Sequence, residues 1–99
     1  MFGLSDIEMQ KLLDVFHRNT AVEGVVLYGS RAKGTYKPFS DVDITLEGKN
    51  LTRHHLNDLQ LQIDDLLLPY HFDISMFSKL KNESLIDHIK RRGIRIYNR

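Results

Sequence analysis

The sequence predicts an α+β fold in which a small mixed β-sheet carries helices mainly on one face. Three observations support this class. Apolar side chains recur at helical spacing in three segments, alternate with polar ones in two others, and fill one short β-branched run. These segments follow one another in the order α-β-loop-β-α-β-α-β. The 99 residues are enough for one compact domain and too few for two, so we expect a single domain over residues 1–99.

The N-terminal part of the chain predicts a helix followed by a buried strand. Ser5 and Glu8 have capping-box spacing, and apolar residues at helical spacing then predict a helix over residues 6–19. The run EGVVLY at 23–28 is short, β-branched and apolar, which is typical of a buried strand. Gly29 follows it and predicts a sharp turn.

Two segments alternate polar and apolar side chains, the pattern of a strand with one buried face. In residues 41–47 one face carries Asp41, Asp43, Thr45 and Glu47, and the other carries Val42, Ile44 and Leu46. In residues 70–77 one face carries His71, Asp73 and Ser75, and the other carries Phe72, Ile74 and Met76. If the two strands pair, the carboxylate of Asp73 can join the carboxylates of the first strand.

The remaining segments predict two helices and a last strand. An apolar stripe between residues 51 and 68 predicts a helix that Pro69 ends. Residues 83–92 predict a short helix whose basic last turn complements the helix dipole, with Gly93 after it. Residues 94–97, IRIY, predict the last strand.

Composition excludes several classes of protein. Hydrophobic residues make up 41% and charged residues 27%, as in soluble globular proteins. A formal net charge of +1 is too balanced for nucleic-acid binding through bulk electrostatics, so direct nucleic-acid binding is not expected. The absence of cysteine excludes disulfides and thiolate zinc sites and is compatible with a reducing cytoplasm, our expected location. No apolar run approaches a membrane span, and no membrane association is expected.

The loop after the first strand combines features that suit a polyphosphate. Gly29 allows a tight turn and close approach of a ligand, and Ser30 adds a hydroxyl. Backbone N–H groups of the following turn, a short helix start, can point at an anion. Arg31 and Lys33 add positive charge. A solvated hairpin turn remains the alternative, and the Walker spacing is absent.

The aspartates suit divalent metal. Residues i and i+2 of a strand point the same way, with Cα atoms roughly 6.6 Å apart, so Asp41 and Asp43 can converge on one or two hard cations. Magnesium prefers oxygen ligands and usually shares them with substrate phosphates. Three acids on one sheet face would repel one another unless a cation neutralised them. Alternatively, Asp41 caps a turn, and Asp43 and Asp73 are solvated strand acids.

Together the two motifs carry a family resemblance. Gly29-Ser30, ten intervening residues, then Asp41-Val42-Asp43 resembles the G-S-x10-D-x-D signature of the DNA polymerase β nucleotidyltransferase superfamily. The sequence from GSRAKG to SDVDI is similar to that of its minimal prokaryotic members, the MNT-type nucleotidyltransferases. The specific part covers residues 23–76. The resemblance implies the polymerase β-like palm fold.

The resemblance also implies roles for these residues. Gly29 and Ser30 would contact the β- and γ-phosphates of a nucleoside triphosphate, for which ATP is expected. Arg31 and Lys33 would neutralise phosphate charge, with a solvated surface position as the alternative. The catalytic metal ligands would be Asp41, Asp43 and Asp73. The expected cofactor is Mg²⁺, as two ions, with Mn²⁺ as a substitute.

MNT proteins are often encoded beside a HEPN-domain protein, a ribonuclease toxin, so the resemblance implies an antitoxin. The expected activity is transfer of AMP to a tyrosine hydroxyl of that partner, with release of pyrophosphate. The alternative is a non-catalytic antitoxin that neutralises the partner by occlusion; transfer to a small molecule is disfavoured because no second domain is present. The sequence does not decide the nucleotide base, the acceptor or the oligomeric state, whether homo- or hetero-oligomer. The roles of His71, Tyr36 and Phe39 also stay open.

Overall fold

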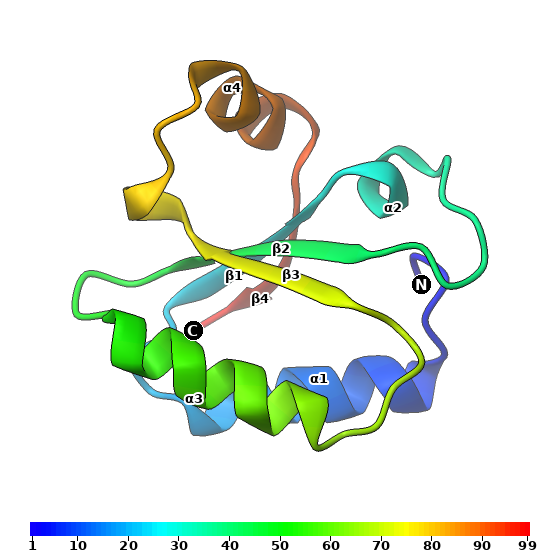
Figure 1. Ribbon diagram of the computed structural model, residues 1–99, viewed down its shortest axis with the longest axis horizontal. Coiled ribbons are helices and arrows are strands. Elements are labelled where there is room, and N and C mark those ends of the chain that lie inside the picture. The colour runs from blue at the N-terminus through cyan, green and yellow to red at the C-terminus, as the bar shows by residue number, and fades with distance from the viewer.

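The computed structural model describes residues 1–99 and contains a four-stranded mixed sheet in the order β3-β2-β1-β4 (Figure 1). The strands are β1 (Gly24–Tyr28), β2 (Val42–Glu47), β3 (Phe72–Met76) and β4 (Ile94–Asn98). Strand β1 pairs antiparallel with both β2 and β4, whereas β2 and β3 are parallel. The predicted mixed sheet is therefore confirmed.

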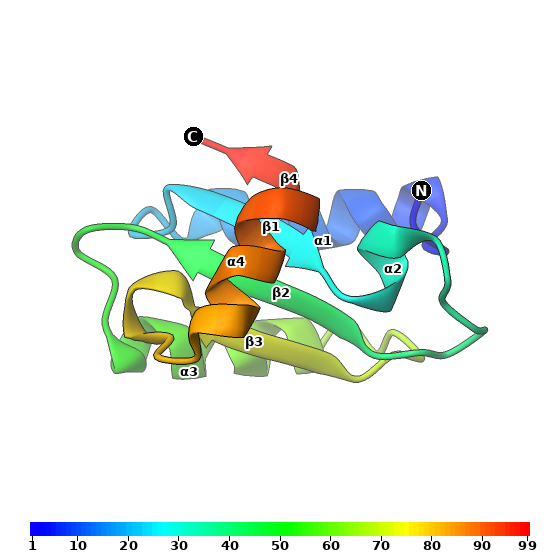
Figure 2. The ribbon, with the colours of Figure 1, turned by 90° about the horizontal axis from the view of Figure 1, so that it is seen from above.

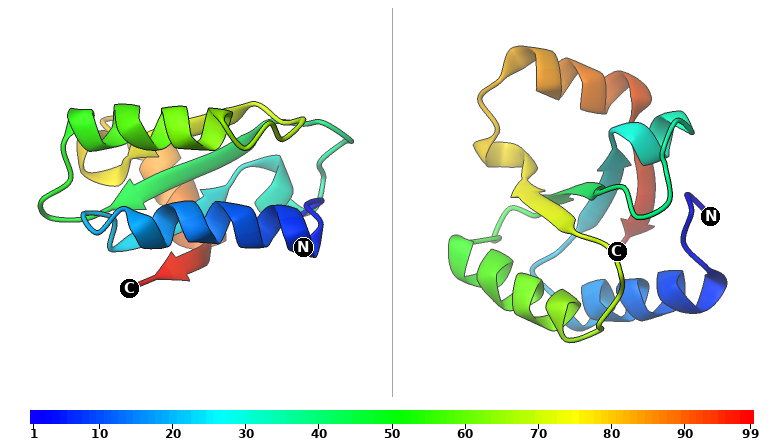
Figure 3. Two further views of the ribbon diagram at one scale, coloured as in Figure 1. Left: turned by 90° about the horizontal axis from the view of Figure 1, so that it is seen from below. Right: turned by 45° about the vertical axis from the view of Figure 1, so that its right-hand side comes forward.

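The helices lie on both faces of this sheet. They are α1 (Asp6–Arg18), α2 (Ser30–Lys33), α3 (Arg53–Asp64), the 3₁₀ turn η1 (Phe77–Lys79) and α4 (Glu83–Arg92). The two longest, α1 and α3, lie side by side and run in opposite directions under one face (Figure 3). Helix α4 crosses the other face above β1, where α2 also lies (Figure 2). No helix is both long enough and apolar enough to span a membrane.

Local sequence signals explain where the first helices begin. The Ser5 hydroxyl accepts a hydrogen bond from the Glu8 N–H at 3.1 Å, and the Glu8 carboxylate accepts one from the Ser5 N–H at 2.9 Å, which completes the predicted capping box of α1. Thr52 caps α3 in the same way. Helix α3 ends before the predicted limit, because the residues after Asp64 turn the chain back toward β3, and Leu67 adopts a positive φ of 56° in that turn.

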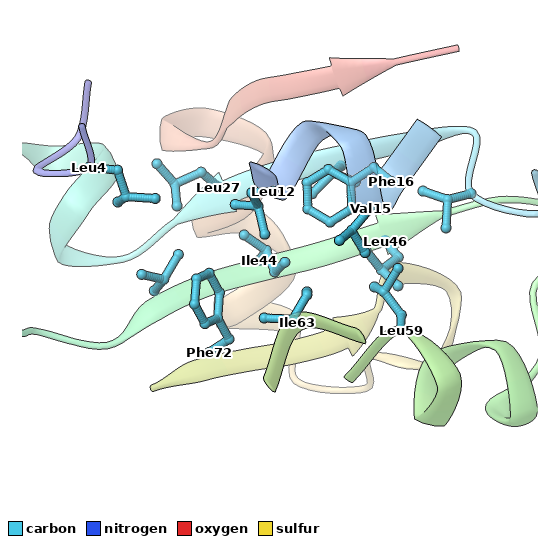
Figure 4. Close-up of a cluster of buried hydrophobic side chains, with 13 residues drawn as sticks. Leu4, Leu12, Val15, Phe16, Leu27, Ile44, Leu46, Leu59, Ile63 and Phe72 are labelled. Atoms are coloured by element: carbon cyan, nitrogen blue, oxygen red, sulfur yellow. The ribbon is translucent and has the colours of Figure 1, made fainter. Parts of the chain in front are cut away.

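The main core lies between the sheet and the α1–α3 layer (Figure 4). The apolar face predicted for β2 is confirmed, because Val42, Ile44 and Leu46 are each 1% exposed or less. They pack against side chains from α1, α3 and the neighbouring strands, among them Leu12, Phe16, Leu27, Leu59, Ile63 and Phe72. Since strand side chains alternate, Asp43 must point to the opposite face of the sheet.

A second, smaller cluster lies on that opposite face. Val26 and Tyr28 of β1 pack against Ile89 of α4. Strand β1 is thus buried on both faces, which explains its continuous apolar run. Helix α4 packs against β1, and the polar faces of β2 and β3 lie beside it, with Asp73 exposed and Asp43 half-buried.

The packing of Ile44 leads to a stability prediction. Replacing this residue by alanine should lower the free energy of unfolding by about 2–5 kcal/mol, because it removes buried methyl groups and leaves a cavity. Urea denaturation followed by circular dichroism measures the change. The matched variant Ile7→Ala, at a position that is 71% exposed on α1, should change it by no more than about 0.5 kcal/mol. Equal losses in both variants would contradict the assignment of the core.

Candidate active site

Two of the predicted acids face each other across neighbouring strands. The parallel register of β2 and β3 pairs Asp43 with Asp73, on the face of the sheet that points away from the main core. Neighbouring strands lie about 4.8 Å apart, so the two carboxylates start from adjacent positions. The two alternating segments do pair, which is the condition under which Asp73 could join the other acids.

The charge of the third acid, Asp41, also acts on Asp43. Burial raises the pKa of the Asp43 carboxyl above its usual value, and the negative charges of Asp73 and Asp41 raise that pKa further. His71 and Arg31 oppose this shift in the pKa. His71, which was expected on the Asp73 face, therefore lies close enough to act on the Asp43 charge.

These acids have no partner within the chain. None of the three ion pairs includes Asp41, Asp43 or Asp73, and no hydrogen bond reaches their carboxylates. They do not form a preassembled cluster of three or more metal ligands. All-carboxylate donors on one face are nevertheless the chemistry that magnesium prefers, and a divalent cation would offset their repulsion. The donor set therefore fits the expected metal.

The turn at Gly29 lies directly against these acids. Gly29 has a φ of +77°, and a Cβ at this position would collide with Oδ2 of Asp43. Both the backbone conformation and the close approach therefore require glycine. Helix α2 begins at Ser30, and Lys33 lies exposed at its end. The two halves of the sequence signature are thus brought into contact.

Arg31 occupies a different position from the one expected of a phosphate ligand. It is 2% exposed, and its Nε and Nη2 donate to the Ser40 carbonyl at 3.2 and 2.7 Å. Its Nε also donates to the Asp41 carbonyl at 3.3 Å, and its Nη1 donates to the Phe2 carbonyl at 2.7 Å. The guanidinium thus ties α2 to the backbone that leads into β2.

Aromatic rings surround this guanidinium. The ring centroids of Tyr36 and Tyr70 lie 5.2 and 4.8 Å from the Arg31 Cζ. The ring of Phe39 lies 6.4 Å from that of Tyr70 and is 69% exposed. Tyr36 therefore supports the loop between the two motifs, whereas Phe39 offers an apolar surface two residues before Asp41.

Two residues at the site were not identified from the sequence. Nε2 of His88, on α4, accepts a hydrogen bond from the Gly29 N–H at 3.3 Å. The ring of His88 stands edge-on to the ring of Tyr28, with centroids 6.4 Å apart and planes at 77°. Burial raises the pKa of Tyr28, and the charges of Asp73 and Asp43 raise it further. The position of Tyr28 just before Gly29 was a signal, but nothing near His88 in the sequence points to this contact.

Comparison with known proteins agrees with this geometry. A family model described as "Polymerase beta, Nucleotidyltransferase" matches residues 10–99. No curated protein matches the chain.

Several solved structures share the fold. A chain of a toxin–antitoxin complex with AMP-PNP is 18% identical and has a TM-score of 0.73, over 92% of this chain and 73% of that chain. A chain from the complex of tri-AMPylated Shewanella oneidensis HEPN toxin with MNT antitoxin is 14% identical and has a TM-score of 0.70, over 97% of this chain and 74% of that chain. A chain of the MntA–HepT toxin–antitoxin complex is also 14% identical, with a TM-score of 0.68, over 96% of this chain and 74% of that chain.

The buried Arg31 should be essential for stability. Arg31→Leu should lower the free energy of unfolding by about 2–4 kcal/mol, because it leaves the carbonyls of Ser40 and Phe2 without a donor. Arg31→Lys should recover only part of that loss, since a single ammonium cannot reproduce the planar fork. Chemical denaturation measures both variants. Lys33→Leu, on the same helix but exposed, should stay within about 0.5 kcal/mol of the wild type, and an equal loss there would contradict this assignment.

The raised pKa of Asp43 predicts a pH dependence of stability. Between the usual pKa of an aspartate and the raised pKa of folded Asp43, the folded chain binds more protons at this carboxyl than the unfolded chain, so the unfolding free energy falls as pH rises through this interval. Asp43→Asn removes the negative charge and should therefore stabilise the chain at neutral pH. The gain in unfolding free energy should be no more than about 1 kcal/mol, because solvent screens the repulsion at this half-buried position.

Thermal denaturation at pH values from 3 to 8 tests this expectation. The gain from Asp43→Asn should shrink at the acidic end, where the wild-type carboxyl is protonated. Asp14→Asn, an exposed acid on α1, serves as the control and should show no such gain. A wild type that is as stable as Asp43→Asn at neutral pH would contradict the expectation that the ionised Asp43 carboxylate destabilises the folded chain.

Proposed function

Because this chain belongs to the polymerase β nucleotidyltransferase family, we propose that it transfers AMP from ATP to a hydroxyl group of a partner protein. One observation carries the proposal: Gly29 lies against Asp43, and Asp43 lies opposite Asp73. A turn suited to phosphates therefore borders acids suited to divalent metal. Nucleotidyl transfer needs these two elements side by side.

Asp41, Asp43 and Asp73 are the residues that would hold two magnesium ions, with manganese as a substitute. Burial and the charges of Asp73 and Asp41 raise the pKa of Asp43, and this cost of the ionised acid favours a bound cation over a bare cluster. Bound magnesium would supply charge neutralisation for the attacking and leaving oxygens of an in-line displacement. The exposure of Asp73 supports a position on the side where an acceptor enters.

The turn residues would bind the triphosphate. We assign Gly29 and Ser30 to the β- and γ-phosphates, and the exposed Lys33 to neutralising their charge. Arg31 is left out of this set, because its donors are engaged by backbone carbonyls. Its proposed role is to hold the turn at a fixed distance from the acids.

In the proposed transfer one bond to the α-phosphorus forms as another breaks. The acceptor oxygen forms a bond to the α-phosphorus, and the bond from that phosphorus to the bridging oxygen breaks. Pyrophosphate leaves with the electron pair. Asp73 accepts the hydroxyl proton, directly or through water, because it is the most accessible member of the paired acids.

We propose a HEPN-domain protein as the partner and a tyrosine as the acceptor. The choice of partner is supported by the likeness in fold to a chain from a complex of MNT antitoxin with tri-AMPylated HEPN toxin, whereas the tyrosine is what the family resemblance implies. The exposed Phe39 beside Asp41 offers the partner an apolar contact at the edge of the site. The reaction would take place in the cytoplasm, where ATP and magnesium are available.

The second candidate is an antitoxin that acts by occlusion alone. It needs the exposed surface around Phe39 but not the acids. Three unpaired acids, two of which raise the pKa of the half-buried Asp43 by their charge, argue for the catalytic candidate, because a binding surface gains nothing from that repulsion.

Incubation with magnesium, α-labelled ATP and the candidate HEPN protein tests the proposal. Intact mass spectrometry should show a gain of one or more AMP units on the partner. The double variant Asp41→Asn/Asp43→Asn should lose at least about 100-fold of this activity, because it removes two metal ligands. Parallel reactions with the other three triphosphates measure the choice of base.

A matched double variant controls for loss of acidic charge. Asp64→Asn/Asp65→Asn removes two exposed acids at the end of α3 and should keep full activity. If the partner is neutralised without any mass gain, and equally well by the Asp41/Asp43 variant, the occlusion candidate is correct and the proposal fails.

A further inference from the structure

We propose that His88 of α4 is a positioning residue for the Gly29–Ser30 turn, so that α4, outside the sequence signature, forms part of the nucleotide site. The two residues are 59 positions apart in the sequence. The hydrogen bond itself follows from the structure, whereas its effect on nucleotide binding rests on the function proposed above.

The contact acts on the residue that sets the geometry of the site. Gly29 ends β1, has a positive φ and lies against the Asp43 carboxylate. The last ladder pair of β1 and β2 joins Tyr28 to Asp43, so the N–H of Gly29 lies beyond the ladder. His88 Nε2 accepts this N–H at 3.3 Å. A rotation of the Gly29 peptide would change where Ser30 points relative to the acids.

The hydrogen bond requires one form of the imidazole. An Nε2 that accepts from a backbone N–H carries no proton of its own, so the ring is neutral and its proton lies on Nδ1. This tautomer can be observed directly.

The fold holds the His88 ring in place. The adjacent residue Ile89 is 4% exposed and packs with Val26 and Tyr28 of β1. The Tyr28 ring stands edge-on to the imidazole. The side chain of Asn82 accepts from the Leu85 N–H at 3.0 Å and caps the start of α4. Helix α4 therefore presents Nε2 to Gly29 from a packed support.

Two substitutions separate positioning from packing. Gln places a carbonyl oxygen near the position of Nε2 and can accept the same hydrogen bond, whereas Leu fills similar space and cannot. We expect His88→Leu to speed hydrogen exchange of the Gly29 amide about 5-fold or more, the effect of one lost hydrogen bond, and His88→Gln to stay close to the wild type. The control His54→Leu replaces a histidine exposed on α3 and should leave this rate unchanged.

The second readout is affinity for AMP-PNP with magnesium, measured by calorimetry. His88→Leu should weaken binding about 3- to 10-fold, and His88→Gln should restore it to within about 2-fold of the wild type. Rescue by Gln is the result that a purely structural role would not give. Thermal denaturation of each variant verifies that it is folded.

Three outcomes overturn the inference. The ¹⁵N signals of the His88 ring could place the proton on Nε2, the Gly29 amide could exchange equally in His88→Leu and wild type, or His88→Leu could bind AMP-PNP as tightly as the wild type. If the wild type itself binds no nucleotide, the function proposed above fails, and the exchange of the Gly29 amide still decides whether His88 positions the turn.

Discussion

Helix α3 carries the chain from the end of β2 back to the start of β3, and this crossover allows the two strands to pair in parallel. Leu59 and Ile63 anchor α3 in the main core, on the same side as Ile44 and Phe72. Burial of one face of each strand therefore fixes the register. A slip of one residue would send the acids into the core, so the apolar packing on one face determines the position of the acids on the other.

Arg31 provides the second constraint, because it joins three segments that are distant in sequence. Its guanidinium binds carbonyls of Phe2, Ser40 and Asp41 and lies against two tyrosine rings. A buried cation costs desolvation energy, which these carbonyls and rings offset. The turn at Gly29 and the strand that carries Asp43 are consequently held together from both ends: by direct contact at Gly29, and by Arg31 at the entry to β2.

The site stores unfavourable electrostatic energy where function is proposed. Asp43 is half-buried beside two other acids and has no cation to pair with, and its pKa is raised as a result. The rest of the chain follows ordinary rules: capped helices, a buried apolar core and no buried side-chain polar atom without a hydrogen bond. Local conflicts of this kind concentrate at functional sites, since a ligand can resolve them.

The sequence by itself determined the order of the elements, the inward faces of β2 and β3, the capping box of α1 and the spacing of the signature from Gly29 to Asp43. These features depend on backbone periodicity and on conformations of single residues, which a short stretch of sequence specifies. Only the tertiary structure decided that Arg31 is buried while Lys33 is exposed, that α4 covers β1 on the face opposite α1 and α3, and that His88 reaches Gly29. The physical reason is that such contacts join segments far apart in the chain, and they exist only once packing of the core has placed those segments side by side.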